Sequence, residues 1–173
     1  IYGKGRADVK WLGALLLLGA SVLTGSRLAS RLAERVERLR AVRGLIERFS
    51  GELAYRRTPT GQLLQAAAGS REFAALPFLR KAAESFDGSV SFSRVWEAAV
   101  GQSSCPPEER ELLLEMGQIV GVSNRDSQVA ALALLASRAD GILEEQAKRA
   151  AVEGRLCRSM GVLGGLLFLV LAL

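Results

Sequence analysis

The segment LASRLAERVERLRAVRGLIERFSGEL, residues 28–53, decides the fold class. Its large apolar residues recur at steps of three and four, which places them on one face of an α-helix, and arginines follow on the neighbouring face. No part of the chain shows the alternation of apolar and polar residues that is typical of a strand. The sequence therefore predicts an all-α fold. One apolar helix face is expected to carry Leu28, Leu32, Val36, Leu39, Val42, Ile46, Phe49 and Leu53.

One apolar run precedes this segment and another closes the sequence. Residues 11–26 carry no charge and would form about 24 Å of helix, slightly less than the hydrocarbon core of a bilayer. Residues 159–173 carry no charge either. A helix over them would have no polar face, which a helix at the surface of a soluble domain needs. We expect one transmembrane helix over residues 11–26 and a second over residues 159–173. They flank an all-helical domain over residues 27–158, and residues 1–10 are left unassigned.

A cleaved signal peptide is the alternative for the first run, because basic residues precede it. The run continues directly into the arginine-rich helix, which favours a retained membrane helix. Each run holds two small residues four positions apart, Ser21 with Gly25 and Gly161 with Gly165, and such pairs let helices approach closely in a membrane. Neither junction with the central domain contains proline, so we expect each to be one continuous, rigid helix.

The formal net charge is +5, but the basic residues are concentrated after the first apolar run. Residues 27–57 hold nine arginines and four glutamates, whereas the chain after residue 57 holds eleven basic and thirteen acidic residues. The positive-inside rule therefore places the central domain in the cytoplasm. Arg27, Arg31, Arg35 and Arg38 are candidates for contact with anionic lipid headgroups or an acidic partner. The alternative function is that of a basic helical protein that binds nucleic acid, or of a scaffold protein that binds lipid.

Several shorter helices are expected after residue 57. Thr58-Pro59 is typical of the N-cap and first position of a helix. Ser91 is expected to cap a short helix with Trp96 in the core, since Trp96 stands at helical spacing among apolar residues. The two prolines at residues 106–107 predict the start of another helix.

The last helix is expected to run from Asp126 to Leu173, because this stretch contains no proline. Gly121 is expected to close the preceding helix as a C-cap residue. Ser123 and Asp126 stand three positions apart, which predicts a capping box at the start of the last helix. The second apolar run would then be the end of the same helix.

The residues needed for common enzyme chemistry are missing from the sequence. It has no histidine, which excludes His-based acid–base catalysis and Ser-His or Cys-His nucleophile pairs. Cys105 and Cys157 lack the spacing of metal ligands, and no Walker-type phosphate loop is present. The adjacent glutamates at residues 108–109 and 144–145 diverge on a helix, so we expect them on solvated surfaces. We predict no enzymatic activity, no catalytic residues, no metal site and no cofactor.

Three motifs, in this order, resemble those of the stage III sporulation protein AB family of endospore-forming bacteria. They are ELAYRRTP at residues 52–59, MGQIVGVSNRDSQ at residues 116–128 and MGVLGGLLFLVLAL at residues 160–173, with a tryptophan in a short helix between the first two. Each motif consists of helix ends and junctions. The positions that carry the resemblance are Glu52, Tyr55, Thr58, Pro59, Trp96, Gly117, Gly121, Asn124, Gln128, Gly161 and Gly165.

The resemblance implies a protein of the outer forespore membrane with its helical domain in the mother-cell cytoplasm. That domain is expected to be similar to the cytoplasmic domains of the F-type platform proteins of type II secretion. The expected role is that of a non-enzymatic platform or assembly subunit of the channel between mother cell and forespore. The expected partners are a secretion-type ATPase, other subunits of the same sporulation complex and membrane lipids, with self-association left open and no nucleic acid.

Overall fold

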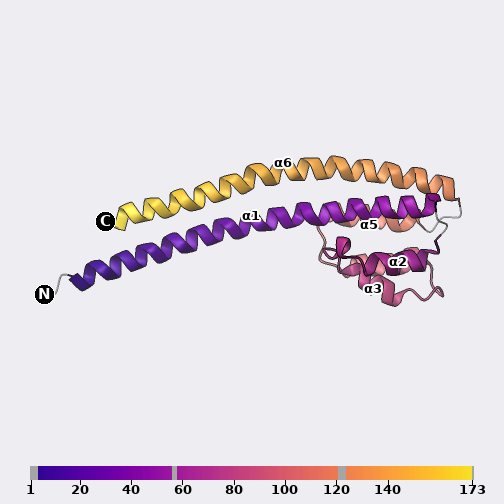
Figure 1. Cartoon of the computed structure of the whole chain (residues 1–173), viewed down its shortest axis with the longest axis horizontal. Helices are drawn as coiled ribbons and strands as arrows, with labels where there is room; N and C mark the ends of the chain where they lie inside the picture. The colour runs from indigo at the N-terminus through magenta and orange to yellow at the C-terminus, as the bar shows by residue number, and fades with distance from the viewer. Residues whose placement is uncertain (1–3, 56–57, 121–123, 173) are drawn as a thin grey trace. The chain divides into compact units, whose positions relative to one another are not determined.

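The computed structural model of the chain describes residues 4–55, 58–120 and 124–172, with the side chains of residues 4–18, 125, 158, 161 and 165–172 outside that description. No strand occurs in these ranges, and the all-α prediction is confirmed. The helices are drawn in Figure 1 and comprise α1 (Lys4–Tyr55), α2 (Thr60–Ala68), the short 3₁₀-helix η1 (Arg71–Phe73), α3 (Phe78–Ser85), α4 (Phe92–Gly101), α5 (Pro107–Ile119) and α6 (Arg125–Ala172).

The chain forms two compact units. One unit, here called the helix pair, combines Ile1–Val36 with Glu145–Leu173 and so contains the first part of α1 and the last part of α6. The other unit, here called the core domain, is Glu37–Glu144. Both α1 and α6 are unbroken helices across the boundary between the units, as the absence of proline predicts.

The apolar face of α1 forms one wall of the hydrophobic core between Val36 and Leu53. Val42, Ile46 and Phe49 are completely shielded from solvent, as the periodicity predicts. The first two positions of the pattern are not part of this core, because Leu28 is 49% exposed and Leu32 is only half-buried. Both residues precede the core domain. The apolar periodicity of α1 therefore begins before the part of the helix that packs in the core.

The shorter helices close the core domain around a cluster of aromatic rings. Trp96 of α4 is 1% exposed, which confirms its predicted place in the core. Its ring centroid lies 6.2 Å from Phe49, 5.3 Å from Phe78 and 5.2 Å from Phe92. Each such pair contributes about 0.5–1.5 kcal/mol beyond the burial of its area. The cluster therefore joins α1, α3 and α4 at one point.

The start of α2 differs from the prediction. Thr58 does not cap the helix: its hydroxyl donates to the Glu52 carboxylate over 2.9 Å, and Pro59 occupies the N-cap position without a side-chain cap. The backbone of Pro59 is extended and not helical (φ −58°, ψ 138°), so the helix begins one residue later than predicted, at Thr60. Ser91 does stand at the N-cap of α4, but its side chain makes no capping hydrogen bond.

Asn124 caps the start of α6. Its side-chain oxygen accepts a hydrogen bond from the backbone N–H of Asp126 over 3.1 Å, and its carbonyl accepts one from the N–H of Gln128 over 3.1 Å. This is the bonding of an Asn N-cap. The predicted C-cap residue Gly121 and the predicted capping residue Ser123 lie outside the described residues.

The helix pair packs through small residues. A Cβ atom added to Gly154 would lie 3.7 Å from the Cβ of Ala29, and one added to Gly164 would lie 3.7 Å from the hydroxyl oxygen of Ser21. Residue numbers rise along α1 as they fall along α6, so the two helices are antiparallel. Because glycine carries no side chain, the two backbones approach closely at these points.

We predict that the Ala29→Cys/Gly154→Cys variant forms an intramolecular disulfide. The 3.7 Å between the two Cβ positions lies inside the range of about 3.5–4.5 Å that a disulfide requires. The measurement is the faster migration of the oxidised chain on a non-reducing gel, in a background with Cys157→Ser.

The matched control is Ala29→Cys/Val152→Cys. Val152 is 60% exposed and is turned about 200° around the α6 axis from Gly154, so this pair should stay reduced. Equal cross-linking of both variants, or a cross-linked dimer in place of the intramolecular product, would contradict the antiparallel pairing.

Within the part of the chain that the structure describes, no helix contains an apolar stretch long enough to cross a membrane. The side chains of residues 11–18 and 165–173, which belong to the two expected transmembrane helices, lie outside that part.

Candidate functional site

A cavity of about 340 Å³ opens in the core domain between α1, α3, α4 and α5. Its apolar lining includes Leu76, Phe78, Ala99 and Leu113, and the loop that joins α4 to α5 forms part of its wall. The charged side chains that line the cavity are Arg38, Lys81 and Glu109.

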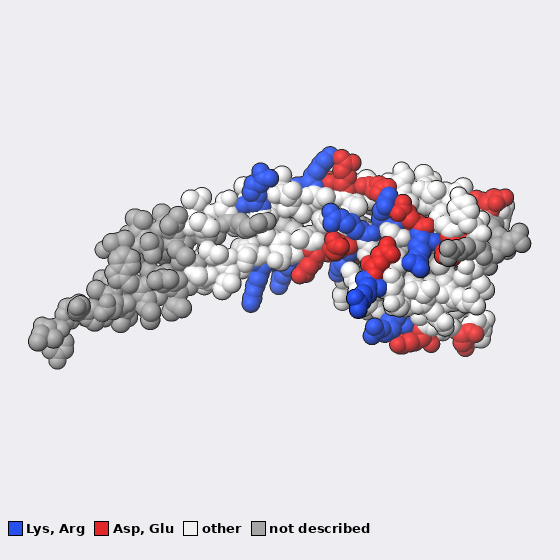
Figure 2. All heavy atoms as spheres, in the orientation of Figure 1, with Lys and Arg blue, Asp and Glu red and all other residues white. Residues whose placement is uncertain are grey.

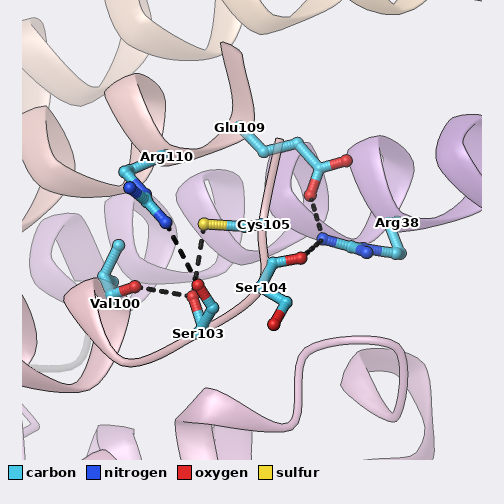
Figure 3. A network of polar contacts seen from close by, with 7 residues as sticks. All are labelled: Arg38, Val100, Ser103, Ser104, Cys105, Glu109 and Arg110. Carbon is cyan, nitrogen blue, oxygen red and sulfur yellow. Dashed lines mark hydrogen bonds and ion pairs between the residues drawn. The ribbon is translucent and has the colours of Figure 1, made fainter. Parts of the chain in front are cut away.

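Arg38 and Glu109 form an ion pair beside this cavity (Figure 3). The guanidinium donates to the Glu109 carboxylate over 2.8 Å and to the carbonyl oxygen of Ser104 over 3.5 Å. Glu109 is 4% exposed, whereas about a third of the Arg38 side chain is exposed. Glu109 also lies in the first turn of α5, where the positive end of the helix dipole favours an anion. The negative charge of the buried Glu109 carboxylate is therefore balanced by the guanidinium and by the helix dipole.

This arrangement corrects one expectation from the sequence. Glu109 was expected on a solvated surface together with Glu108, yet only Glu108 is exposed. Neighbours on a helix point about 100° apart, so one of them faces the core here. The cation that makes this burial tolerable is Arg38, which stands 71 positions earlier in the chain.

The loop between α4 and α5 is held from several sides (Figure 3). The Ser103 hydroxyl lies 2.6 Å from the carbonyl oxygen of Val100 and 3.2 Å from the sulfur of Cys105. Arg110 donates to the carbonyl oxygen of Ser103 over 3.2 Å, and Arg38 reaches the next carbonyl. The cavity wall is therefore fixed by side chains of both α1 and α5.

We predict that Arg38→Met lowers the free energy of unfolding by about 2 kcal/mol, because Glu109 stays buried without its cation. The expected loss is smaller than for a fully buried pair, since Arg38 is partly solvated. The double variant Arg38→Met/Glu109→Leu should recover most of the loss, because no buried charge remains. Urea unfolding followed by circular dichroism measures all three proteins.

Arg40→Met is the matched control for this experiment. Arg40 lies on the same helix and pairs with Glu37 over 3.0 Å, but both side chains are more than half exposed. Such a surface pair contributes less than about 1 kcal/mol. An equal loss from Arg38→Met and Arg40→Met would show that Glu109 does not need Arg38.

Two residues of the family motifs, Trp96 and Gly117, form one contact between α4 and α5. The indole N–H of Trp96 donates to the carbonyl oxygen of Leu113 over 2.6 Å. A Cβ atom on Gly117 would lie only 3.0 Å from Cγ of Trp96 and 3.1 Å from its Nε1. Gly117 therefore leaves the space that the indole fills.

The other motif residues lie at separate helix junctions. Glu52 and Thr58 are hydrogen-bonded to each other at the end of α1, and Asn124 and Gln128 are joined at the start of α6. Tyr55 is 88% exposed. Pro59 is the exposed N-cap residue of α2. Gly161 and Gly165 lie in α6, with their surroundings outside the described side chains, and Gly121 lies outside the described residues.

The arginines expected to contact lipid or a partner fall into two groups. Arg27, Arg31 and Arg35 are exposed in the helix pair, and no ion pair involves them in the described part of the chain. Arg38 belongs to the core domain and is engaged with Glu109. Over the core domain, basic and acidic side chains are intermixed in the view of Figure 2.

The contacts of Glu109, Ala29, Gly154 and Gly164 were not predicted from the sequence. An Arg-rich helix and a glutamate beside a proline pair are visible in the sequence, but nothing in it joins Arg38 to Glu109. In the described residues, no cluster of three or more His, Cys, Asp or Glu side chains is arranged to hold a metal ion.

Comparison with known proteins gives the family. A family model for stage III sporulation protein AB matches residues 10–173. Stage III sporulation protein AB of Bacillus subtilis (strain 168) is 29% identical over an alignment 173 residues long, gaps included, which covers 94% of this chain and 98% of that protein. No solved structure matches the chain. The near-complete match confirms the resemblance of the motifs, and the chain belongs to the stage III sporulation protein AB family.

Proposed function

We propose that this chain is a non-enzymatic membrane platform subunit of the channel between mother cell and forespore. Its family supports a role in sporulation. The observation that carries the proposal is the pairing of α1 with α6: both long helices leave the core domain and contact each other through Gly154 and Gly164. Each of them runs toward an apolar end of the sequence, as the anchors of a platform protein would.

The placement of the motif residues supports an architectural role. Trp96 with Gly117, Glu52 with Thr58, and Asn124 with Gln128 each fix a different helix junction. Groups that act on a substrate converge on one pocket, whereas these residues stabilise the shape of the core domain. A fixed shape is what an assembly subunit offers to its partners.

The proposed location is the outer forespore membrane, with the core domain in the mother-cell cytoplasm. Arg27, Arg31 and Arg35 follow the first apolar run, are exposed and would meet the anionic headgroups of the cytoplasmic leaflet. The proposed partners are a secretion-type ATPase and the other subunits of the same sporulation complex. The function needs no cofactor.

Co-purification tests this proposal. The full chain with an affinity tag is purified from detergent-solubilised membranes of sporulating cells, and the recovered proteins are identified by mass spectrometry. We expect the chain in the membrane fraction, in a complex with the secretion-type ATPase. Recovery of the intact chain from the soluble fraction as a monomer would contradict the proposal.

A further inference from the structure

The cavity beside Arg38 has a neighbouring hollow along α3 and α4. A second hollow of about 210 Å³ lies next to it, lined by side chains of α3 and α4 together with Val90. The two hollows share Lys81, Ala99 and Gln102. They therefore adjoin each other, and together they are called the α3–α4 groove.

The lining of the α3–α4 groove combines apolar surface with uncompensated positive charge. Val90 contributes apolar surface to the lining and is 40% exposed. Lys81 and Arg94 are exposed, and no carboxylate pairs with either of them in the described part of the chain. Glu109 contributes a negative charge to the lining, and Arg38 neutralises it.

Several other cations of the core domain, unlike Lys81 and Arg94, pair with carboxylates. Arg43 lies 2.7 Å from both Asp140 and Glu47, and these contacts, the hydrogen bond to Asp140 first among them, raise the pKa of its guanidinium. Arg138 lies between two glutamates of α5 at 2.5 and 2.9 Å. The groove thus keeps two cations available beside an apolar surface.

We propose that the α3–α4 groove binds a segment of a partner protein that presents a large apolar side chain between carboxylates. The apolar side chain would enter the cavity lined by Phe78, Ala99 and Leu113, and the carboxylates would meet Lys81 and Arg94. This charge complementarity selects an acidic segment over a neutral or basic one. The inference rests on the proposed function and gives the chemistry of one partner contact.

The groove is formed before a partner arrives. Arg110 and Arg38 hold the carbonyl groups of Ser103 and Ser104, so the loop that borders the cavity is fixed in place. A preformed site loses less conformational freedom on binding than a mobile one. An anchor side chain in a pocket, with charged groups around it, is also the common arrangement at protein interfaces.

Peptide selection tests the groove. A random peptide library displayed on phage is selected on the full chain in detergent, and the selected peptides are then measured by fluorescence anisotropy. We expect enrichment of sequences in which Leu, Ile, Phe or Met is flanked by Asp or Glu. Binding of these peptides should weaken by about tenfold or more in the Lys81→Glu/Arg94→Glu variant, because attraction becomes repulsion.

Arg80→Glu is the matched control. Arg80 is exposed on α3 directly beside Lys81, but it lines neither hollow, so this variant should bind the peptides within about twofold of the unchanged chain. Circular dichroism checks that all three proteins are folded. Equal weakening by Arg80→Glu would overturn the groove proposal, because the effect would then be general.

The remaining outcomes also decide the matter. Selection of no peptides, or of peptides without carboxylates, would overturn the proposal. The chain could also self-associate and lose this association in the Lys81→Glu/Arg94→Glu variant. That result would assign the groove to a second copy of the chain and would also overturn the proposal. If peptide selection fails but the chain still co-purifies with its complex, only the groove proposal is rejected. If the chain binds the peptides but is a soluble monomer in cells, only the proposed platform function is rejected.

Discussion

Gly117→Ala is expected to lower the free energy of unfolding by about 3 kcal/mol. The added methyl group would lie 3.0 Å from Cγ of Trp96 and 3.1 Å from its Nε1, and closer still to Cδ1. Trp96 has little freedom to move, because it is 1% exposed and its Nε1 donates to the carbonyl oxygen of Leu113. It also packs against the rings of Phe49 and Phe92. Relief of the overlap must therefore disturb the centre of the core.

Urea unfolding measures this loss, and Gly141→Ala serves as its control. Gly141 lies in α6 within the core domain, and an added Cβ would meet no atom within 4 Å. Because alanine favours a helix over glycine, Gly141→Ala should gain up to about 1 kcal/mol. A Gly117→Ala protein as stable as the unchanged chain would show that α4 and α5 are not packed as described.

Val152→Pro is expected to reduce the number of heat-resistant spores by about a hundredfold or more, because an interior proline kinks a helix. Proline costs about 3 kcal/mol in a helix interior, since it removes a backbone donor and clashes with the preceding turn. Val152 lies two residues before Gly154, which approaches Ala29 to 3.7 Å in the helix pair. A kink at this point separates the two helices and interrupts the continuous α6.

Val152→Ala is the control at the same position. Val152 is 60% exposed, so its truncation removes little packing and leaves the helix intact. Spore counts are compared with the amount of protein in the membrane fraction, which we expect to be similar for both variants. A Val152→Pro chain that is present in the membrane and fully active would refute the requirement for a rigid, unbroken α6.

The helical architecture was predictable because it depends on local patterns. The spacing of apolar residues identified the buried face of α1 from Val36 to Leu53, and the lack of proline identified α6 as one long helix. The same spacing continues to Leu28, which is exposed. Periodicity shows which face of a helix is apolar, and it does not show where along the helix the core ends.

The contacts of the candidate site depend on distant residues, and the sequence alone does not reveal them. Arg38 and Glu109 stand 71 positions apart and meet only because α5 packs beside α1. The match to family motifs singled out Gly117, but the physical reason, its contact with Trp96, needs the packing of α4 on α5. The start of α2 was predicted one residue too early. Thr58 was expected to cap this helix, but its hydroxyl is hydrogen-bonded to the Glu52 carboxylate instead.

One labelling experiment tests the central claim, that the membrane anchors the chain and the core domain faces the cytoplasm. Tyr55 is 88% exposed in the core domain, so Tyr55→Cys in a chain with Cys105→Ser and Cys157→Ser presents one accessible thiol. A membrane-impermeant maleimide should label this thiol in sealed inside-out membrane vesicles and not in right-side-out vesicles. Labelling in right-side-out vesicles, or loss of the chain from the vesicles on alkaline extraction, would contradict the account.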